Sequence, residues 1–226
     1  MKQLMLFDID QTIFDGYTIF PLTKAQFQDK FIDFKTMELF TQDLAEYKVG
    51  LYDYEKFVAV LLDHWAKGLA GQSYQAVFDH SFSFFKKHKK HFFSYFSKVV
   101  KNCSQTHDIF LVTGEPDFLA ASIAKMFNVK GYLASQFELN QQGLFTGKVS
   151  QYLATKKDKK EALDGLFQKY SFKNSYAFGD SEADIQMLSL VEHPICVNPG
   201  ADLEKIALKK AWSVIDPETF DVSILK

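Results

Sequence analysis

The sequence predicts an α/β protein in which a doubly wound parallel sheet carries an inserted helical domain. Two observations lead to this fold class. Short, uninterrupted apolar runs alternate with helical patterns in the outer parts of the chain, as in a parallel sheet with helices on both faces. Between them, from about residue 15 to residue 104, helical patterns follow one another without a convincing strand, over a stretch too long for a loop.

The apolar runs predict the strands, because strands covered on both faces carry apolar side chains without interruption. The first run stops at Asp8, and the second stops at Thr113. Residues 140–143 are a hairpin signal between two short strands. The predicted strands are residues 4–7, 108–112, 132–134, 137–139, 144–147, 175–178, 195–197 and 212–215.

Glycine, proline and capping residues delimit the expected helices. Glycines break the helical patterns of the insertion, whereas Pro116, Asp158 and Ser181 open later helices. The predicted helices are residues 24–34, 35–47, 53–67, 73–88, 92–102, 116–127, 158–170, 181–190 and 201–209. We therefore expect a core domain of residues 1–14 and 92–226, with a helical cap domain of residues 15–91.

Composition narrows the possible partners. The 226 residues carry a net charge of -2, and all 26 basic residues are lysines. This balance gives no general attraction to nucleic acid or to an anionic membrane, and no segment approaches the roughly 20 apolar residues that cross a bilayer. The two cysteines form no C-x-x-C pair, which favours reduced thiols. We expect a cytoplasmic monomer or homodimer that binds neither nucleic acid nor membranes.

Carboxylates follow the strands that should lie near one another in the sheet. Asp8 and Asp10 come directly after the first strand, Asp180 follows a later one, and Asp184 is one helical turn beyond it. Ligands of open parallel sheets bind at the carboxyl ends of the strands. Clustered carboxylates repel unless a cation is present, and oxygen ligands without His or Cys suit Mg²⁺. The sequence therefore predicts a magnesium site at this edge.

The chain contains four short motifs in a fixed order. They are residues 8–12 (D-I-D-Q-T), residues 110–114 (F-L-V-T-G), a lysine at a helix start and residues 179–185 (G-D-S-E-A-D-I). With them the chain resembles the haloacid dehalogenase superfamily of phosphohydrolases, and within it the phosphoserine-phosphatase-like subfamily IB. This resemblance implies a phosphatase with a Rossmann-like core, an inserted cap and a Mg²⁺ cofactor.

The resemblance also implies roles for individual residues. Asp8 resembles the nucleophile that forms an aspartyl-phosphate, and Asp10 the general acid. The metal ligands would come from Asp8, Asp10 (through its backbone carbonyl), Asp180 and, as an orienting group, Asp184. Phosphate-binding groups would be Thr12, Thr113, Gly114 and a lysine.

That lysine lies in the run of residues 156–160, where all but Asp158 are lysines. The family pattern places it in the first helical turn, about four residues before an apolar core position. Leu163 is such a position, so Lys159 fits best, Lys156 is the next candidate, and the others stay open.

The chain departs from the phosphoserine phosphatases in its substrate-binding residues. Those enzymes clamp the amino-acid end of the substrate with a cap glutamate and a cap arginine, whereas this chain has no arginine, and Asp15 is the only acid soon after motif one. We therefore expect a small phosphorylated metabolite other than phosphoserine as the main substrate. The aromatic-rich cap favours an apolar or cationic substrate end, such as that of a phosphoamine. A phosphotransferase with the same intermediate, or a non-catalytic binding protein, remains the alternative.

Overall fold

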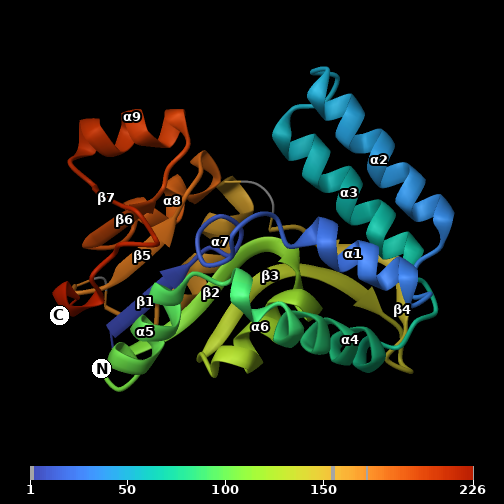
Figure 1. Cartoon of the computed structure of the whole chain (residues 1–226), viewed down its shortest axis with the longest axis horizontal. Coiled ribbons are helices and arrows are strands. Elements are labelled where there is room, and N and C mark those ends of the chain that lie inside the picture. The colour runs from blue at the N-terminus through green and yellow to red at the C-terminus, as the bar shows by residue number, and fades with distance from the viewer. Residues whose placement is uncertain (1–2, 154–155, 172, 226) are drawn as a thin grey trace.

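The computed structural model describes residues 3–153, 156–171 and 173–225 and has a seven-stranded sheet at its centre (Figure 1). The strand order is β4-β3-β2-β1-β5-β6-β7, and every neighbouring pair is parallel except β3 and β4. The strands are β1 (Gln3–Phe7), β2 (His107–Pro116), β3 (Gly131–Leu139), β4 (Phe145–Gln151), β5 (Tyr176–Gly179), β6 (His193–Val197) and β7 (Ser213–Ile215). The predicted α/β fold class is confirmed.

The two faces of the sheet bury different helices, because successive strand residues point to opposite sides. Met5 and Phe7 of β1 face α5 (Ser94–Cys103) and α6 (Asp117–Phe127) in one apolar cluster. Leu4 and Leu6 face a second cluster. That cluster draws on α7 (Lys156–Phe167), α8 (Ile185–Ser189) and α9 (Ala201–Lys210). Uninterrupted apolar runs thus form strands covered on both faces.

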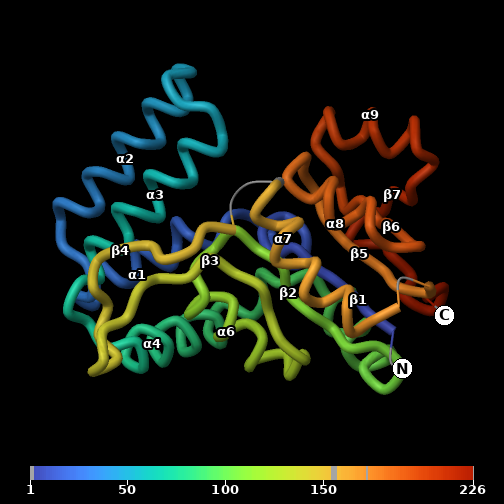
Figure 2. The backbone as a smooth tube through the Cα atoms, turned by 180° about the vertical axis from the view of Figure 1, so that it is seen from behind, coloured from blue at the N-terminus to red at the C-terminus, as the bar shows by residue number. Residues whose placement is uncertain are grey.

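Four helices lie between β1 and α5. They are α1 (Ile19–Gln28), α2 (Phe34–Lys48), α3 (Tyr54–Gly68) and α4 (Tyr74–Lys87). In Figures 1 and 2, α2 and α3 stand side by side, with α3 next to β4 at the edge of the sheet, whereas α4 runs along α6. Ser122 of α6 donates a hydrogen bond to the Phe78 carbonyl of α4 at 3.3 Å. The fourth helix of the expected cap therefore packs on the core.

The predicted bounds of the first of these helices were wrong. The helix starts five residues earlier than expected, at Ile19, and Pro21 lies in its first turn, where a missing N–H costs no helical hydrogen bond. Lys30, with a left-handed φ of 63°, follows its end. Asp33 then caps α2 by accepting a hydrogen bond from the Thr36 N–H at 2.8 Å.

Other predicted bounds shift less. The helix expected at 158–170 is α7, from Lys156 to Phe167. The one expected at 181–190 begins as a 3-10 turn, Glu182–Asp184, before α8. Pro116 immediately precedes α6 instead of opening it.

The predicted hairpin is confirmed as β3 and β4, and it braces the inserted helices. Its edge pairs with the loop between α3 and α4, where the Gly71 N–H donates to the Phe145 carbonyl at 2.8 Å. The Phe145 N–H in turn donates to the Gln72 carbonyl at 3.0 Å. The hairpin therefore anchors the base of the α2–α3 pair to the sheet.

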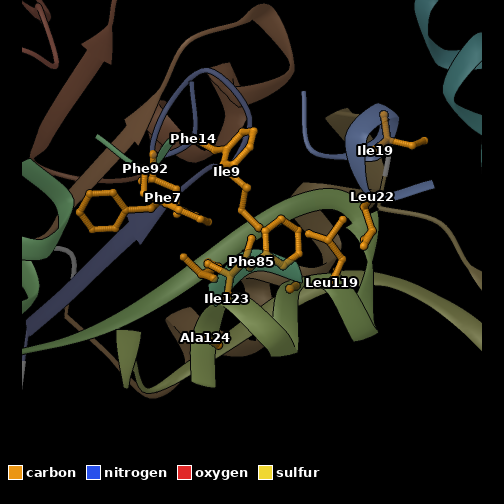
Figure 3. Packing of buried hydrophobic residues seen from close by; sticks show 14 of the residues in the cluster. Phe7, Ile9, Phe14, Ile19, Leu22, Phe85, Phe92, Leu119, Ile123 and Ala124 are labelled. Carbon is orange, nitrogen blue, oxygen red and sulfur yellow. The ribbon is translucent and has the colours of Figure 1, made fainter. Parts of the chain in front are cut away.

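An apolar cluster fixes the loop that follows β1. Figure 3 shows Phe7, Ile9 and Phe14 packed among side chains from α4 and α6, with Phe85 at the centre. Phe14 and Phe92 meet edge to face, with ring centroids 5.0 Å apart. The loop bearing Asp8 and Asp10 is therefore anchored by its apolar neighbours. Among the described residues, no helix is long and apolar enough to cross a membrane.

Candidate active site

The sheet topology brings the predicted residues to one edge. β1 lies between β2 and β5 in parallel register, so Asp8 and Asp180 directly follow adjacent strands, and Thr113 lies near the end of β2. The Asp8 N–H donates to the Phe178 carbonyl at 3.0 Å, which holds the start of the loop against β5. The Asp8 side chain is buried at the floor of the site.

Lys159 lies among the carboxylates. Its Nζ is 2.8 Å from Asp184 Oδ1 and 3.5 Å from Asp8 Oδ1, and the side chain is buried. Lys157, two residues earlier on α7, is exposed and pairs with Glu161 at 3.8 Å. The side chain of Lys156, the second candidate, lies outside the described residues. Withdrawal from water lowers the pKa of Lys159, but Asp184 and Asp8 outweigh this effect, so the net shift is upward and the ammonium stays charged.

Asp184 organises the loop after β5. Its Oδ2 accepts hydrogen bonds from the N–H groups of Asp180 and Ser181 and from the Ser181 hydroxyl, each at 3.2 Å. This arrangement requires Gly179, because a Cβ there would lie 2.5 Å from the Asp184 Cβ. Gly179 of the fourth motif is therefore required for steric reasons, because it leaves room for the carboxylate that pairs with Lys159.

Asp10 lies in the loop that joins β1 to α1. Its Oδ1 accepts hydrogen bonds from the Thr18 N–H at 3.0 Å and from the Thr18 hydroxyl at 2.7 Å. Its carboxyl also shares a hydrogen bond with that of Glu115, a residue absent from our sequence prediction. Burial raises the pKa of Asp10 to about 6, while the Thr18 and Glu115 hydrogen bonds oppose that rise.

The remaining predicted residues line the same edge. The Thr12 hydroxyl donates to Asp180 Oδ1 at 3.3 Å, and its carbonyl accepts a hydrogen bond from the Tyr95 hydroxyl at 2.8 Å. Thr113 is buried, and its hydroxyl oxygen accepts from the Glu115 N–H at 3.2 Å. The Gly114 carbonyl accepts from the Ser135 hydroxyl at 2.6 Å. The proposed site residues therefore lie near the carboxyl ends of the strands, in the segments that follow them and, for Lys159, on α7.

The donor set fits a hard divalent cation. One carboxylate oxygen from each of Asp8, Asp180 and Asp184 lies within 4.8 Å of the others. Burial and the neighbouring Asp184 raise the pKa of Asp180 to about 8, and burial raises the pKa of Asp8 well above its usual range. Crowded acids with raised pKa values are the pattern expected where a cation supplies the missing positive charge.

The inserted helices contribute side chains that the sequence prediction did not identify. Tyr54, at the start of α3, is half exposed, and the charges of Lys159, Asp8 and Glu115 act on its hydroxyl. Thr18, just before α1, holds Asp10. Neither residue belongs to a motif, and each reaches the site through the packing of the insertion. Glu115 directly follows motif two, and this position was the one feature of the sequence that could have indicated its place in the site.

Sequence comparisons identify relatives that are named as phosphatases or hydrolases. A histidinol-phosphatase of Neisseria meningitidis is 24% identical over 230 residues, which cover 96% of this chain and 99% of the relative. A phosphoserine phosphatase of Mycobacterium tuberculosis is 32% identical over 110 residues, covering 48% of this chain and 35% of the relative. A putative hydrolase of Mycobacterium leprae also matches in sequence, and the match covers only 37% of that relative's length.

Solved structures share the fold. A protein of unknown function from Bordetella pertussis superposes with a TM-score of 0.77 at 21% identity, covering 96% of this chain and 99% of the other. A phosphoserine phosphatase carrying a phospho-aspartyl intermediate analogue superposes with a TM-score of 0.61 at 19% identity, covering 98% and 96%.

Residues 5–189 match the haloacid dehalogenase-like hydrolase family, and the chain belongs to that family. It is therefore an enzyme, and the names of its relatives support a phosphatase. The predicted family resemblance is confirmed.

Proposed function

We propose that the protein is a Mg²⁺-dependent phosphomonoester hydrolase that works through an aspartyl-phosphate on Asp8. The observation that carries the proposal is the position of the Asp8 carboxyl. It lies at the carboxyl edge of the sheet, within 4.8 Å of two other carboxylates and 3.5 Å from the Lys159 ammonium. Lys159 on one side and a Mg²⁺ ion at the carboxylates on the other would together keep Asp8 ionised and able to attack phosphorus.

Each described residue then has a chemical task. An Asp8 oxygen attacks phosphorus and the bond from phosphorus to the ester oxygen breaks, while Asp10 gives its proton to the leaving oxygen. Asp10 next takes a proton from water, whose oxygen attacks phosphorus and releases Asp8 and inorganic phosphate. Thr12, Thr113, Gly114 and Lys159 are the groups proposed to hold the phosphoryl oxygens. Mg²⁺ would be held by Asp8, the Asp10 carbonyl and Asp180, with Asp184 orienting these groups, and would supply positive charge that reduces repulsion between Asp8 and the phosphate.

The raised pKa of Asp10 supports its role as the acid. A carboxyl with a pKa of about 6 holds a proton more readily at neutral pH than an ordinary aspartate does, so it can protonate the leaving oxygen. Thr18 fixes the orientation of this carboxyl from the cap side. We propose that residues 15–91 act as a cap over the site, which restricts the substrate to a small phosphorylated metabolite.

The test is phosphate release from a panel of small phosphomonoesters with and without Mg²⁺. L-histidinol phosphate belongs in the panel because the relative matched along nearly its whole length is named a histidinol-phosphatase. Wild type and Asp164→Asn, an exposed aspartate on α7, should release phosphate only with Mg²⁺, and Asp8→Asn should lose the activity. Release by Asp8→Asn at the wild-type rate would contradict the proposal.

A further inference from the structure

The second motif lies in a part of β2 that has more residues than the strand beside it. Val112 of β2 pairs with Leu133 of β3, and Pro116 pairs with Ser135. The β2 residues between these pairs, residues 113–115, therefore lie opposite a single residue of β3. A regular ladder cannot bond every backbone group of such a bulge, so side chains have to satisfy some of them.

Two hydroxyl groups hold one peptide unit of this bulge from opposite sides. The Ser135 hydroxyl donates to the Gly114 carbonyl at 2.6 Å. The N–H of the same peptide, on Glu115, donates to the Thr113 hydroxyl oxygen at 3.2 Å. Because the peptide is planar, the bond from Ser135 also fixes the direction of the N–H at Thr113. Ser135 is fully buried and Thr113 is nearly so, which keeps water from competing for these bonds.

This contact determines what the Thr113 hydroxyl can do. A hydroxyl has one proton to donate and accepts hydrogen bonds through its oxygen lone pairs. The oxygen accepts the Glu115 N–H, so the proton of Thr113 is directed away from that N–H. Among the described residues, no acceptor receives this proton. It is therefore available to a phosphoryl oxygen, the group that Thr113 is proposed to hold.

The same serine also bonds the segment that leads to the active-site lysine. The Ser135 hydroxyl oxygen accepts the Leu153 N–H at 2.9 Å. Leu153 is buried in one apolar cluster with Leu163 of α7, the helix that carries Lys159. One hydroxyl thus connects the second motif with the segment before the third.

We propose that Ser135 is a positioning residue of the phosphatase site, which orients the Thr113 hydroxyl toward the phosphoryl group through the Gly114–Glu115 peptide. The inference rests on the proposed phosphatase function and adds a residue that belongs to none of the four motifs. Ser135 does not touch the substrate. It holds a phosphate-binding hydroxyl in one orientation before the substrate arrives, so that no reorganisation is needed during attack.

Ser175 provides a matched control for Ser135→Ala. It is fully buried, and its hydroxyl donates to the Ser171 carbonyl at 2.6 Å and accepts the Leu4 N–H at 3.3 Å. It therefore makes the same kinds of bond as Ser135, but it precedes β5 and lies at the amino edge of the sheet, opposite the site. Ser175→Ala should destabilise the fold about as much as Ser135→Ala does.

The first measurement is kcat/KM for p-nitrophenyl phosphate with Mg²⁺. A hydrogen bond to a charged group contributes enough to change kcat/KM about 10- to 100-fold, so Ser135→Ala should lower kcat/KM at least about tenfold, whereas Ser175→Ala should leave it within about twofold of wild type. Ser135→Thr keeps the hydroxyl and should restore most of the activity. Ser135→Cys keeps the size and a weak donor, so it serves where the alanine variant does not fold. A wild-type kcat/KM in Ser135→Cys or Ser135→Ala would overturn the inference.

A double-mutant cycle distinguishes positioning from a merely structural role. Thr113→Val removes the hydroxyl that Ser135 is proposed to orient. In that background Ser135→Ala should lower kcat/KM little further, because the two residues act through one hydrogen bond. Losses that multiply in full would show that Ser135 does not act through Thr113.

Binding of inorganic phosphate gives a readout independent of turnover. Calorimetry with Mg²⁺ should show weaker phosphate binding in Ser135→Ala and unchanged binding in Ser175→Ala. Equal effects of the two alanine variants on phosphate affinity and on kcat/KM overturn the role of Ser135 and leave the phosphatase standing. Failure of the wild type to release phosphate from p-nitrophenyl phosphate or any ester of the panel, with Mg²⁺ bound, overturns the proposed function and with it the inference.

Discussion

Lys159→Met tests the electrostatic arrangement of the site most directly. The lysine side chain is 4% exposed, and its ammonium lies 2.8 Å from Asp184 and 3.5 Å from Asp8. Methionine keeps the length and most of the apolar contacts but removes the charge. Removing one partner of a buried ion pair costs about 3–5 kcal/mol, because the other charges are left uncompensated. For a chain of this size that loss lowers Tm by about 6–20 °C.

The neighbouring lysine is the control. Lys157 is on the same helix, but its side chain is 83% exposed and its ammonium is 3.8 Å from Glu161. A surface pair of this kind contributes about 0–1 kcal/mol. Thermal denaturation at neutral pH should therefore show a large loss of Tm in Lys159→Met and almost none in Lys157→Met. Phosphate release should follow the same order.

The pH and metal dependence sharpen the test. Because the pKa of Lys159 is raised in the folded state, its stabilising effect is fully present below the pKa of a free lysine and is lost only above its folded pKa. The stability difference caused directly by Lys159 should thus be the same at pH values of about 6 to 9. Mg²⁺ should raise Tm more in Lys159→Met than in wild type, since it compensates the buried carboxylates that the substitution leaves without a positive partner. Equal, small losses of Tm in both lysine variants would refute this account.

Two further perturbations follow from the geometry. Because the folded-state pKa of Asp10 is raised to about 6, its ionisation destabilises the metal-free fold progressively as pH rises past about 4, approaching about 3 kcal/mol well above pH 6. Asp10→Asn should reduce this pH dependence in urea denaturation without Mg²⁺, and an unchanged slope would contradict the assignment. Gly179→Ala should cost about 2 kcal/mol or more and weaken Mg²⁺ binding, because its Cβ would lie 2.5 Å from that of Asp184. Gly165→Ala, on α7 with nothing within 4 Å, should instead stabilise by about 0.5–1 kcal/mol, and equal effects in chemical denaturation would argue against the steric reason.

The sequence was sufficient for the sheet because its strands are buried on both faces. Residues 4–7 and 176–178 are apolar without a break, and no helical pattern competes with that interpretation. The same strands end in Asp8 and Asp180, so the position of these carboxylates follows from the parallel order alone. Local pattern and tertiary environment favour the same structure in these segments.

The insertion was harder to predict because its helices depend on contacts distant in sequence. The first helix begins at Ile19, yet the apolar pattern alone allowed a helix starting at residue 24. Asp33 was an available capping signal, and using it would have ended that helix earlier. The packing of α4 along α6 depends on long-range contacts such as that between Ser122 and Phe78. The division of the chain into core and cap at residues 15 and 91 stays a prediction.

Glu115 illustrates a different limit. It belongs to no motif, and it lies in β2 between Val112 and Pro116, where the register with β3 shifts, so the sequence did not indicate its contact with Asp10. The lack of arginine was visible in the sequence but indicated only which substrate end cannot be clamped. Asp8 and Asp180, by contrast, follow strands that the apolar pattern alone predicts. Their meeting at one edge of the sheet therefore follows from the strand order and needs no knowledge of side-chain contacts.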